Sequence, residues 1–168
     1  MTAVLTTPAP RENWQTDEDE ELLSRQPARR SLRFKLEPDG SIAVNSLAPL
    51  PDWVGHAATV LTELLALPEN WNGYGAQVIE RPVVPVVLNF LAYVFAEGTP
   101  PLPDLVPTID GGVQLEWHVG GFDLEVEFSP RTGVRAYFCD EAAGEEWEVP
   151  ALSNPDRLGR ALTRLRDQ

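Results

Sequence analysis

The stretch VQLEWHVGGFDLEVEF, residues 113–128, determines the fold of this chain more than any other segment. Apolar and polar residues alternate without a break on both sides of a Gly-Gly pair, which is the pattern of two half-buried strands joined by a two-residue turn. The apolar positions are Val113, Leu115, Trp117, Val119, Phe122, Leu124, Val126 and Phe128. The sequence therefore predicts an antiparallel hairpin with one face in a hydrophobic core.

The opposite face of this hairpin is acidic. With the Gly-Gly pair as the turn, three cross-strand pairs are predicted: His118 with Asp123, Glu116 with Glu125, and Gln114 with Glu127. Two glutamates directly across a ladder repel, and Arg135 on a following strand is expected beside Glu127. Three interpretations stay open: a solvated face, a face for a basic partner that relieves the repulsion, or a metal site through Glu116, Glu125 and a nearby Asp or His.

The flanking sequence predicts more strands and three helices. Residues 134–140 indicate a third strand of a meander and residues 145–149 a fourth, while residues 31–47 alternate around a turn and indicate an N-terminal hairpin. Residues 82–96 are apolar nearly all round, which is typical of a buried helix. We expect an α+β fold, in which a mostly antiparallel sheet (meander 112–139 plus the N-terminal hairpin) packs against this central helix.

Local signals set the expected helix ends. A first helix is predicted to run to about residue 66 with Asp52 as its cap. The central helix tolerates its prolines if Pro82 lies at the boundary and Pro85 in the first turn, where backbone N–H groups have no helical partner. A C-terminal amphipathic helix is expected to begin at Asn154-Pro155-Asp156 and to bury Leu158, Ala161, Leu162 and Leu165.

Two large rings stand in the connection LPENWNGYGA, residues 67–76. Its glycines permit a tight path and its asparagines can bond nearby backbone groups. The rings either cover the core or serve as an aromatic anchor for a partner. The pattern favours Trp71 as the plug of the core and Tyr74 as the contact residue.

Length and charge bound the function. The length of 168 residues and the composition predict a disordered tail, residues 1–30, followed by a single α+β domain, residues 31–168. The net charge is −13, and residues 36–150 hold 18 acidic groups against three arginines. Such a body repels nucleic acid and anionic lipid and favours a basic partner, although solubility alone also explains it. Because neither a secretory signal nor a membrane-spanning run is visible, we expect a cytoplasmic protein.

Signals of catalysis are weak. The two histidines fall on different predicted elements, no serine stands in a G-x-S-x-G turn, and the lone Cys139 excludes an internal disulfide and a cysteine-based zinc site. The connection 67–76 lacks the phosphate-binding pattern GxxxxGK[ST]. The sequence therefore predicts no catalytic residue, no cofactor and no metal site.

The segments LPENWNGYGA and PTIDGGVQLEW together resemble a family of small bacterial proteins of unassigned function. That family is characterised by an NWxGYGA loop, a helix, and a PTxxGGxxLEW strand motif. The similarity covers about residues 50–140 and implies a helix–loop–helix–meander core, but no activity. Asn72 stands where the family pattern leads us to expect Asp, and both residues suit a turn.

These observations favour a non-enzymatic acidic interaction protein that binds a basic protein partner, with an antitoxin- or immunity-like role as the most concrete version. The expected partner-binding residues are Trp71, Tyr74, Glu116, His118, Asp123, Glu125 and Glu127. The alternative is an enzyme that binds a small ligand or a metal through the carboxylates of the sheet. No nucleic-acid or membrane partner is expected, and the sequence does not predict the oligomeric state.

Overall fold

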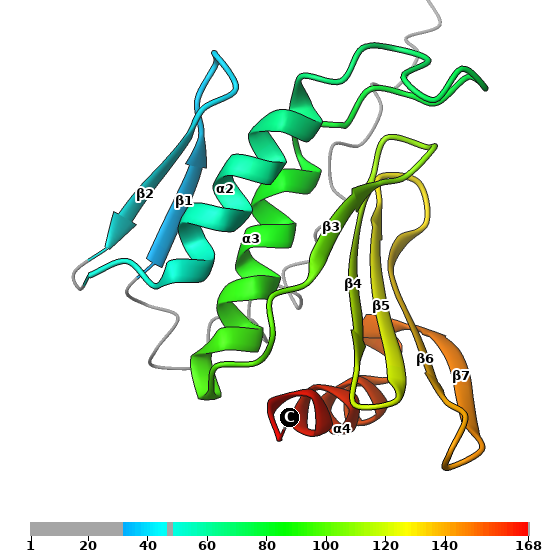
Figure 1. Cartoon of the computed structure of the whole chain (residues 1–168). Helices are drawn as coiled ribbons and strands as arrows, with labels where there is room; N and C mark the ends of the chain where they lie inside the picture. Colours follow the sequence, from blue (N-terminus) through cyan, green and yellow to red (C-terminus); the bar gives the residue numbers. More distant parts are fainter. Residues whose placement is uncertain (1–31, 47–48, 168) are drawn as a thin grey trace, which may run out of the picture.

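The computed structural model describes residues 32–46 and 49–167, so the predicted tail, residues 1–30, lies outside the described residues. The strands are β1 Leu32–Leu36, β2 Ile42–Ser46, β3 Asp104–Pro107, β4 Val113–Val119, β5 Phe122–Ser129, β6 Gly133–Asp140 and β7 Glu145–Pro150. The helices are α2 Asp52–Leu65, α3 Val83–Val94 and α4 Pro155–Arg166, with short 3₁₀ turns at Phe95–Glu97 and Ala151–Ser153. The predicted α+β class is confirmed (Figure 1).

The main sheet has five antiparallel strands in the order β3-β4-β5-β6-β7. Its register confirms the predicted pairs of Glu116 with Glu125, His118 with Asp123 and Gln114 with Glu127. The sequence analysis missed β3, which pairs with β4 at the edge of the sheet. This strand has four residues and ends in a proline, and prolines are tolerated at a sheet edge although they make the segment resemble a linker.

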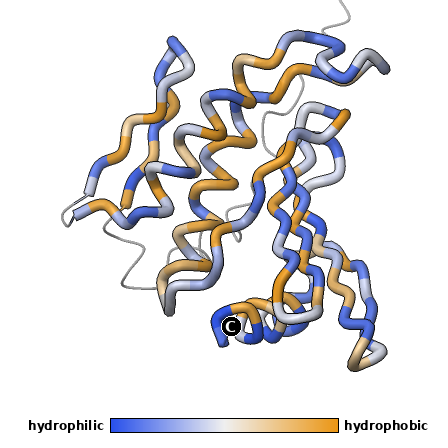
Figure 2. Tube along the Cα trace, in the orientation of Figure 1, coloured by the Kyte–Doolittle hydropathy of each residue, from blue (hydrophilic) through white to orange (hydrophobic). Residues whose placement is uncertain are grey.

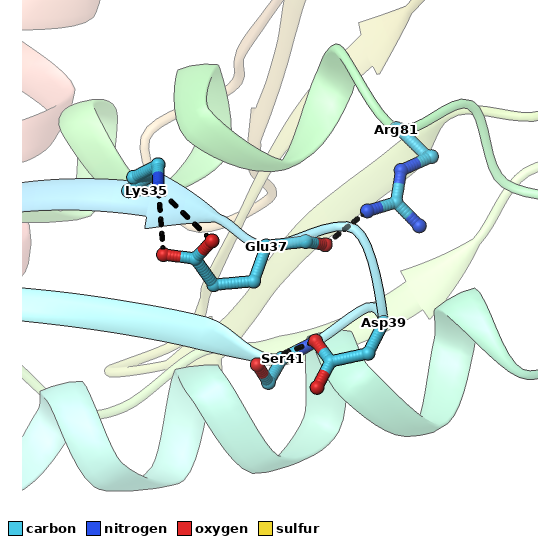
Figure 3. Close-up of polar contacts among 5 residues, drawn as sticks. All are labelled: Lys35, Glu37, Asp39, Ser41 and Arg81. Atoms are coloured by element: carbon cyan, nitrogen blue, oxygen red, sulfur yellow. Dashed lines mark hydrogen bonds and ion pairs between the residues drawn. The ribbon is translucent and has the colours of Figure 1, made fainter.

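The N-terminal hairpin forms a separate two-stranded sheet, β1-β2. It contacts α3, which also contacts β4 and β5, so the helical layer lies between the hairpin and the main sheet (Figure 1). Arg81, just before α3, donates a hydrogen bond to the carbonyl oxygen of Glu37 at the hairpin's end (Figure 3). Lys35 bonds the Glu37 carboxylate at 2.9 Å, so the hairpin is tied both to itself and to the chain that enters α3.

The hydrophobic core lies between the helices and the alternating apolar face of the main sheet. Figure 2 shows the alternation along β4 and β5 and the nearly continuous hydrophobic trace of α3. Helix α3 covers one end of this face, where Phe90 meets Phe128 with ring centroids 5.3 Å apart. Helix α4 covers the other end, and its four predicted apolar residues are all buried.

The helix ends agree with the sequence except at the N-cap of α2. Pro82 occupies the N-cap of α3 and Pro85 lies in its first turn, as predicted. The expected cap by Asp52 is wrong, because Pro51 holds the N-cap and its carbonyl accepts from the Val54 N–H at 3.0 Å. Asn154 takes the N-cap of α4 without a side-chain hydrogen bond. None of the described helices is long and apolar enough to cross a membrane.

One buried carboxylate joins α4 to the sheet. Asp140, on the apolar face at the end of β6, is only 1% exposed and pairs with Arg164 of α4. The Arg164 guanidinium lies 5.2 Å from the ring centroid of Phe122 and 5.7 Å from that of Phe138. The backbone N–H of Ala143 and the Arg164 charge hold the pKa of Asp140 below its ordinary value, so this carboxylate is ionised where α4 docks.

Candidate functional site

The polar face is the surface of the main sheet that points away from α3 and α4. Its seven carboxylates come from four of the five strands, β3, β4, β5 and β7: Asp104, Glu116, Asp123, Glu125, Glu127, Glu146 and Glu148. Its other polar side chains are Gln114, His118, Arg135, Tyr137 and Cys139. One guanidinium therefore faces seven carboxylates, which makes this the most acidic surface that the described strands form.

Strand register organises these carboxylates into rows. One row runs across the whole sheet through Asp104, Glu116, Glu125, Tyr137 and Glu148. Directly opposed residues on neighbouring strands have side chains about 5 Å apart. The like charges of this row are therefore held close together by the backbone itself, and the side chains can separate only by turning away from one another.

A shared amide moderates the predicted repulsion between Glu116 and Glu125. The Gln114 side chain donates one hydrogen bond to each carboxylate, both at 3.0 Å. Partial burial raises the pKa of Glu125, and the charge of Glu116 raises it further. The ionised pair is thus disfavoured even with the amide in place, and a cation at this point would stabilise it.

His118 extends the same network toward the Gly-Gly turn. Its Nδ1 lies 2.7 Å from the Asp123 carboxylate and its Nε2 lies 3.4 Å from Glu116. The hydrogen bond with Asp123, followed by that with Glu116, raises the pKa of His118 above its ordinary value. The predicted cross-strand pair of His118 and Asp123 is present, and both side chains are about half exposed.

The His118 contacts give the fold a pH dependence of known sign. A raised folded-state pKa means that the protonated imidazole stabilises the fold fully below the ordinary value of 6.5, and that this contribution is lost as pH rises through the folded-state pKa. We expect Asp123→Asn to lower the His118 pKa in an NMR titration of the imidazole. An unchanged His118 pKa in this variant would contradict the assigned hydrogen bond.

A shallow hollow of about 290 Å³ lies on the polar face. It is lined by Gln114, Glu125, Glu127, Arg135, Ala136, Tyr137 and Glu148. Arg135 lies beside Glu127 in register, as predicted, but its guanidinium bonds Glu148 at 2.6 and 2.9 Å. Burial, and then the charge of Asp110, raise the pKa of Glu127. The hollow therefore contains one arginine that already forms an ion pair, and two carboxylates, Glu125 and Glu127, whose pKa values are raised.

Within residues 32–46 and 49–167, no group of three or more His, Cys, Asp and Glu side chains is placed to hold a metal ion. The separation follows from the strand geometry and from the bonds already described, since Glu116 and Glu125 turn toward the Gln114 amide.

The connection 67–76 is a tightly bonded loop. Asn70 accepts from the Gly75 N–H at 2.6 Å, and Asn72 accepts from the Tyr74 N–H at 2.8 Å, which confirms the expected turn chemistry. Trp71 is half-buried, lies outside the core cluster and donates to the Gln77 carbonyl at 3.2 Å. The expected plug of the core is therefore wrong, because the indole closes its own loop instead.

The residues that directly follow the loop 67–76 contact the PTIDGG turn. The Gln77 N–H donates to the Ile109 carbonyl at 2.9 Å and the Glu80 N–H donates to that of Gly111 at 2.8 Å. Segment 77–80 therefore lies against the turn between β3 and β4.

A polar network inside the β3–β4 turn was missed by the sequence analysis. Asp110 accepts from Thr108 at 2.6 Å and from the buried Ser129 hydroxyl at 2.5 Å. Burial alone would raise the pKa of Asp110, but the hydrogen bonds from Ser129, Thr108 and the backbone hold it below its ordinary value. The pattern PTIDGG contained the signal, since Thr and Asp before two glycines are typical turn residues. The network shapes the turn that receives segment 77–80.

Comparison of the chain with protein-family models, with curated proteins and with solved structures finds no match. The resemblance of residues 50–140 to the bacterial family therefore stays a prediction.

Proposed function

We propose that this protein is a non-enzymatic interaction protein whose polar face binds a basic protein partner. The observation that carries the proposal is the imbalance of seven carboxylates to one arginine on a surface formed by all five strands. A partner's lysines and arginines would neutralise charges that the sheet holds in opposed rows. Charge complementarity of this kind accelerates association and excludes acidic competitors.

The most concrete version is an antitoxin- or immunity-like protein of the bacterial cytoplasm that restrains its partner. The small size of the chain and its net charge of −13 support this version. The same charge disfavours nucleic acid and anionic membranes as partners, because both would be repelled.

A second candidate is a small-ligand site, favoured by the hollow over Arg135 and Tyr137. A small cationic compound could bond Glu125 and Glu127 there, and an enzyme could use the same carboxylates as acid and base. Native mass spectrometry separates the candidates. A bound small molecule supports the ligand site, whereas a stoichiometric basic protein supports the interaction protein.

Replacing both Glu116 and Glu125 with glutamine is expected to leave the free protein as stable as the wild type or slightly more stable. The change removes a like-charge pair, while both new side-chain carbonyls can still accept from Gln114. Thermal unfolding measures the effect. A strong loss of stability would mean that these glutamates are structural, and it would remove the basis for the proposed interface.

The same variant tests binding. The tagged full-length chain would be purified from its native host, and stoichiometric basic proteins would be quantified at low and high salt. We expect the double glutamine variant to lose the partner as high salt does, because screening and charge removal act on one interaction. Asp52→Asn with Glu63→Gln removes two exposed charges from α2 and serves as the matched control. Equal loss in both variants would indicate net charge alone and contradict the assigned face.

A further inference from the structure

Three of the five large hydrophobic side chains that are exposed in the described residues lie in segment 74–78 and in the β3–β4 turn that bonds it. In the described part of the chain, Tyr74 is 94% exposed, Ile109 70% and Val78 48%. Tyr74 lies in the loop 67–76 and Val78 lies two residues after it. Ile109 lies on the β3–β4 turn, and its carbonyl accepts a hydrogen bond from the Gln77 N–H. Exposed apolar residues that come together from separate segments are typical of interaction sites.

The loop presents Tyr74 in a fixed backbone geometry. Asn70 has a φ of 59°, a left-handed conformation that non-glycine residues rarely adopt. The loop is closed by the hydrogen bond from the Asn70 N–H to the Ala76 carbonyl at 2.7 Å, and Asn72 accepts from both Tyr74 and Ala76. The backbone of Tyr74 is thus held in place before any partner binds, which reduces the entropy lost on association.

This geometry contributes little to the protein's own core. A ring that is 94% exposed buries almost none of its apolar area, and Trp71 uses its indole to close the loop. An amphipathic ring on a rigid support is the kind of side chain that dominates protein interfaces.

The charges around these side chains restrict what could cover them. Glu69 in the connection 67–76 and Glu80 shortly after it are both exposed, and Asp110 directly follows Ile109. The charge of Asp110 also reaches Glu127 on the polar face, so the β3–β4 turn adjoins the acidic surface. An acidic or purely apolar occupant would meet these carboxylates unfavourably, whereas a segment that mixes cationic and apolar side chains complements both.

We propose that Tyr74, with Val78 and Ile109, is the apolar anchor of the partner interface, and that it receives an aliphatic or aromatic side chain flanked by lysine or arginine. The anchor rests on the proposed function, because it serves the same basic partner as the polar face. The polar face supplies long-range attraction, and the anchor supplies contacts that salt does not screen.

Two short labelled peptides test the anchor against the full-length protein: an alternating arginine–glycine peptide and an alternating arginine–leucine peptide of equal length. Fluorescence anisotropy would measure their affinities at low and high salt. Tyr74→Ser is expected to weaken the arginine–leucine peptide about tenfold, the usual effect of losing an interface anchor, and to leave the arginine–glycine peptide unchanged. Leu50→Ser, which removes another exposed hydrophobic side chain, 50% exposed before α2, should change neither.

The outcomes separate the two proposals. If Tyr74→Ser behaves like Leu50→Ser, or weakens both peptides equally, the anchor is overturned. If Glu116→Gln with Glu125→Gln fails to weaken either peptide, the proposed function of the polar face fails, and the Tyr74 comparison between the peptides still stands. Tyr74 is almost fully exposed, so circular dichroism should show a wild-type fold for the serine variant.

Discussion

Replacing Trp117 with alanine is expected to lower the free energy of unfolding by about 3–5 kcal/mol, the usual range for a buried large aromatic. Trp117 is 1% exposed in the middle of β4 and lies in the core cluster that α3 and α4 cover. Its indole N–H also donates to the Pro101 carbonyl at 2.9 Å. The substitution leaves both a cavity and an unsatisfied carbonyl, and urea denaturation followed by circular dichroism would measure the loss.

Two further variants separate the contribution of the Trp117 hydrogen bond from that of its buried apolar volume. Trp117→Phe retains most of the apolar volume and loses the hydrogen bond, which is worth about 1 kcal/mol. Trp71→Ala removes a tryptophan that lies outside the core cluster, so its cost should be clearly smaller. An alanine variant at position 117 that unfolds within about 1 kcal/mol of the wild type would contradict the assignment of the sheet faces.

Replacing Gly112 with alanine is expected to destabilise the protein by about 1–3 kcal/mol or more, the range for inserting atoms into a packed site. A Cβ at this position would lie 2.3 Å from the Phe128 carbonyl oxygen and 2.7 Å from the Thr108 hydroxyl. The Gly112 N–H also donates to that hydroxyl at 2.9 Å. Since the conflict is with backbone, the turn must shift and the contact with segment 77–80 should weaken.

Amide hydrogen exchange distinguishes this mechanism from a general loss of stability. In the Gly112 variant, the amides of Gln77 and Glu80 should exchange faster relative to those of β5, because both bond the displaced turn. Gly55→Ala is the matched control, since no atom lies within 4 Å of the added Cβ and the helical position favours alanine. A Gly112 variant as stable as the wild type would show that the turn is not closely packed.

The meander could be predicted in register because its information is local. Unbroken alternation around Gly120-Gly121 permits one pairing that buries every apolar residue, and a slip by one residue would expose them all. The same logic placed Glu116 and Glu125 opposite each other, as the structure has them. Tyr74 was predicted as the contact residue, and the structure leaves it 94% exposed.

The features that could not be predicted from the sequence depend on contacts between residues far apart in the chain and on how the helices and sheets pack in layers. Arg135 forms its ion pair with Glu148 on the next strand, although Glu127 lies directly opposite it in register. Asp140 occupies a position of β6 where the alternation predicts a buried apolar residue. Its ion pair with Arg164 forms only because α4 docks beside it. The separation of the N-terminal hairpin from the main sheet likewise follows from the position of α3, which local periodicity does not encode.

Backbone NMR of the labelled full-length protein, titrated with the arginine–glycine peptide, tests the central claim most directly. The account predicts that the largest shift changes fall on β4, β5 and β6 around Glu116, Glu125 and Glu127. These changes should disappear at high salt and in the Glu116→Gln, Glu125→Gln variant. Changes spread over the other acidic surfaces, or unaltered by the two substitutions, would contradict the assignment of the polar face as the site for a basic partner.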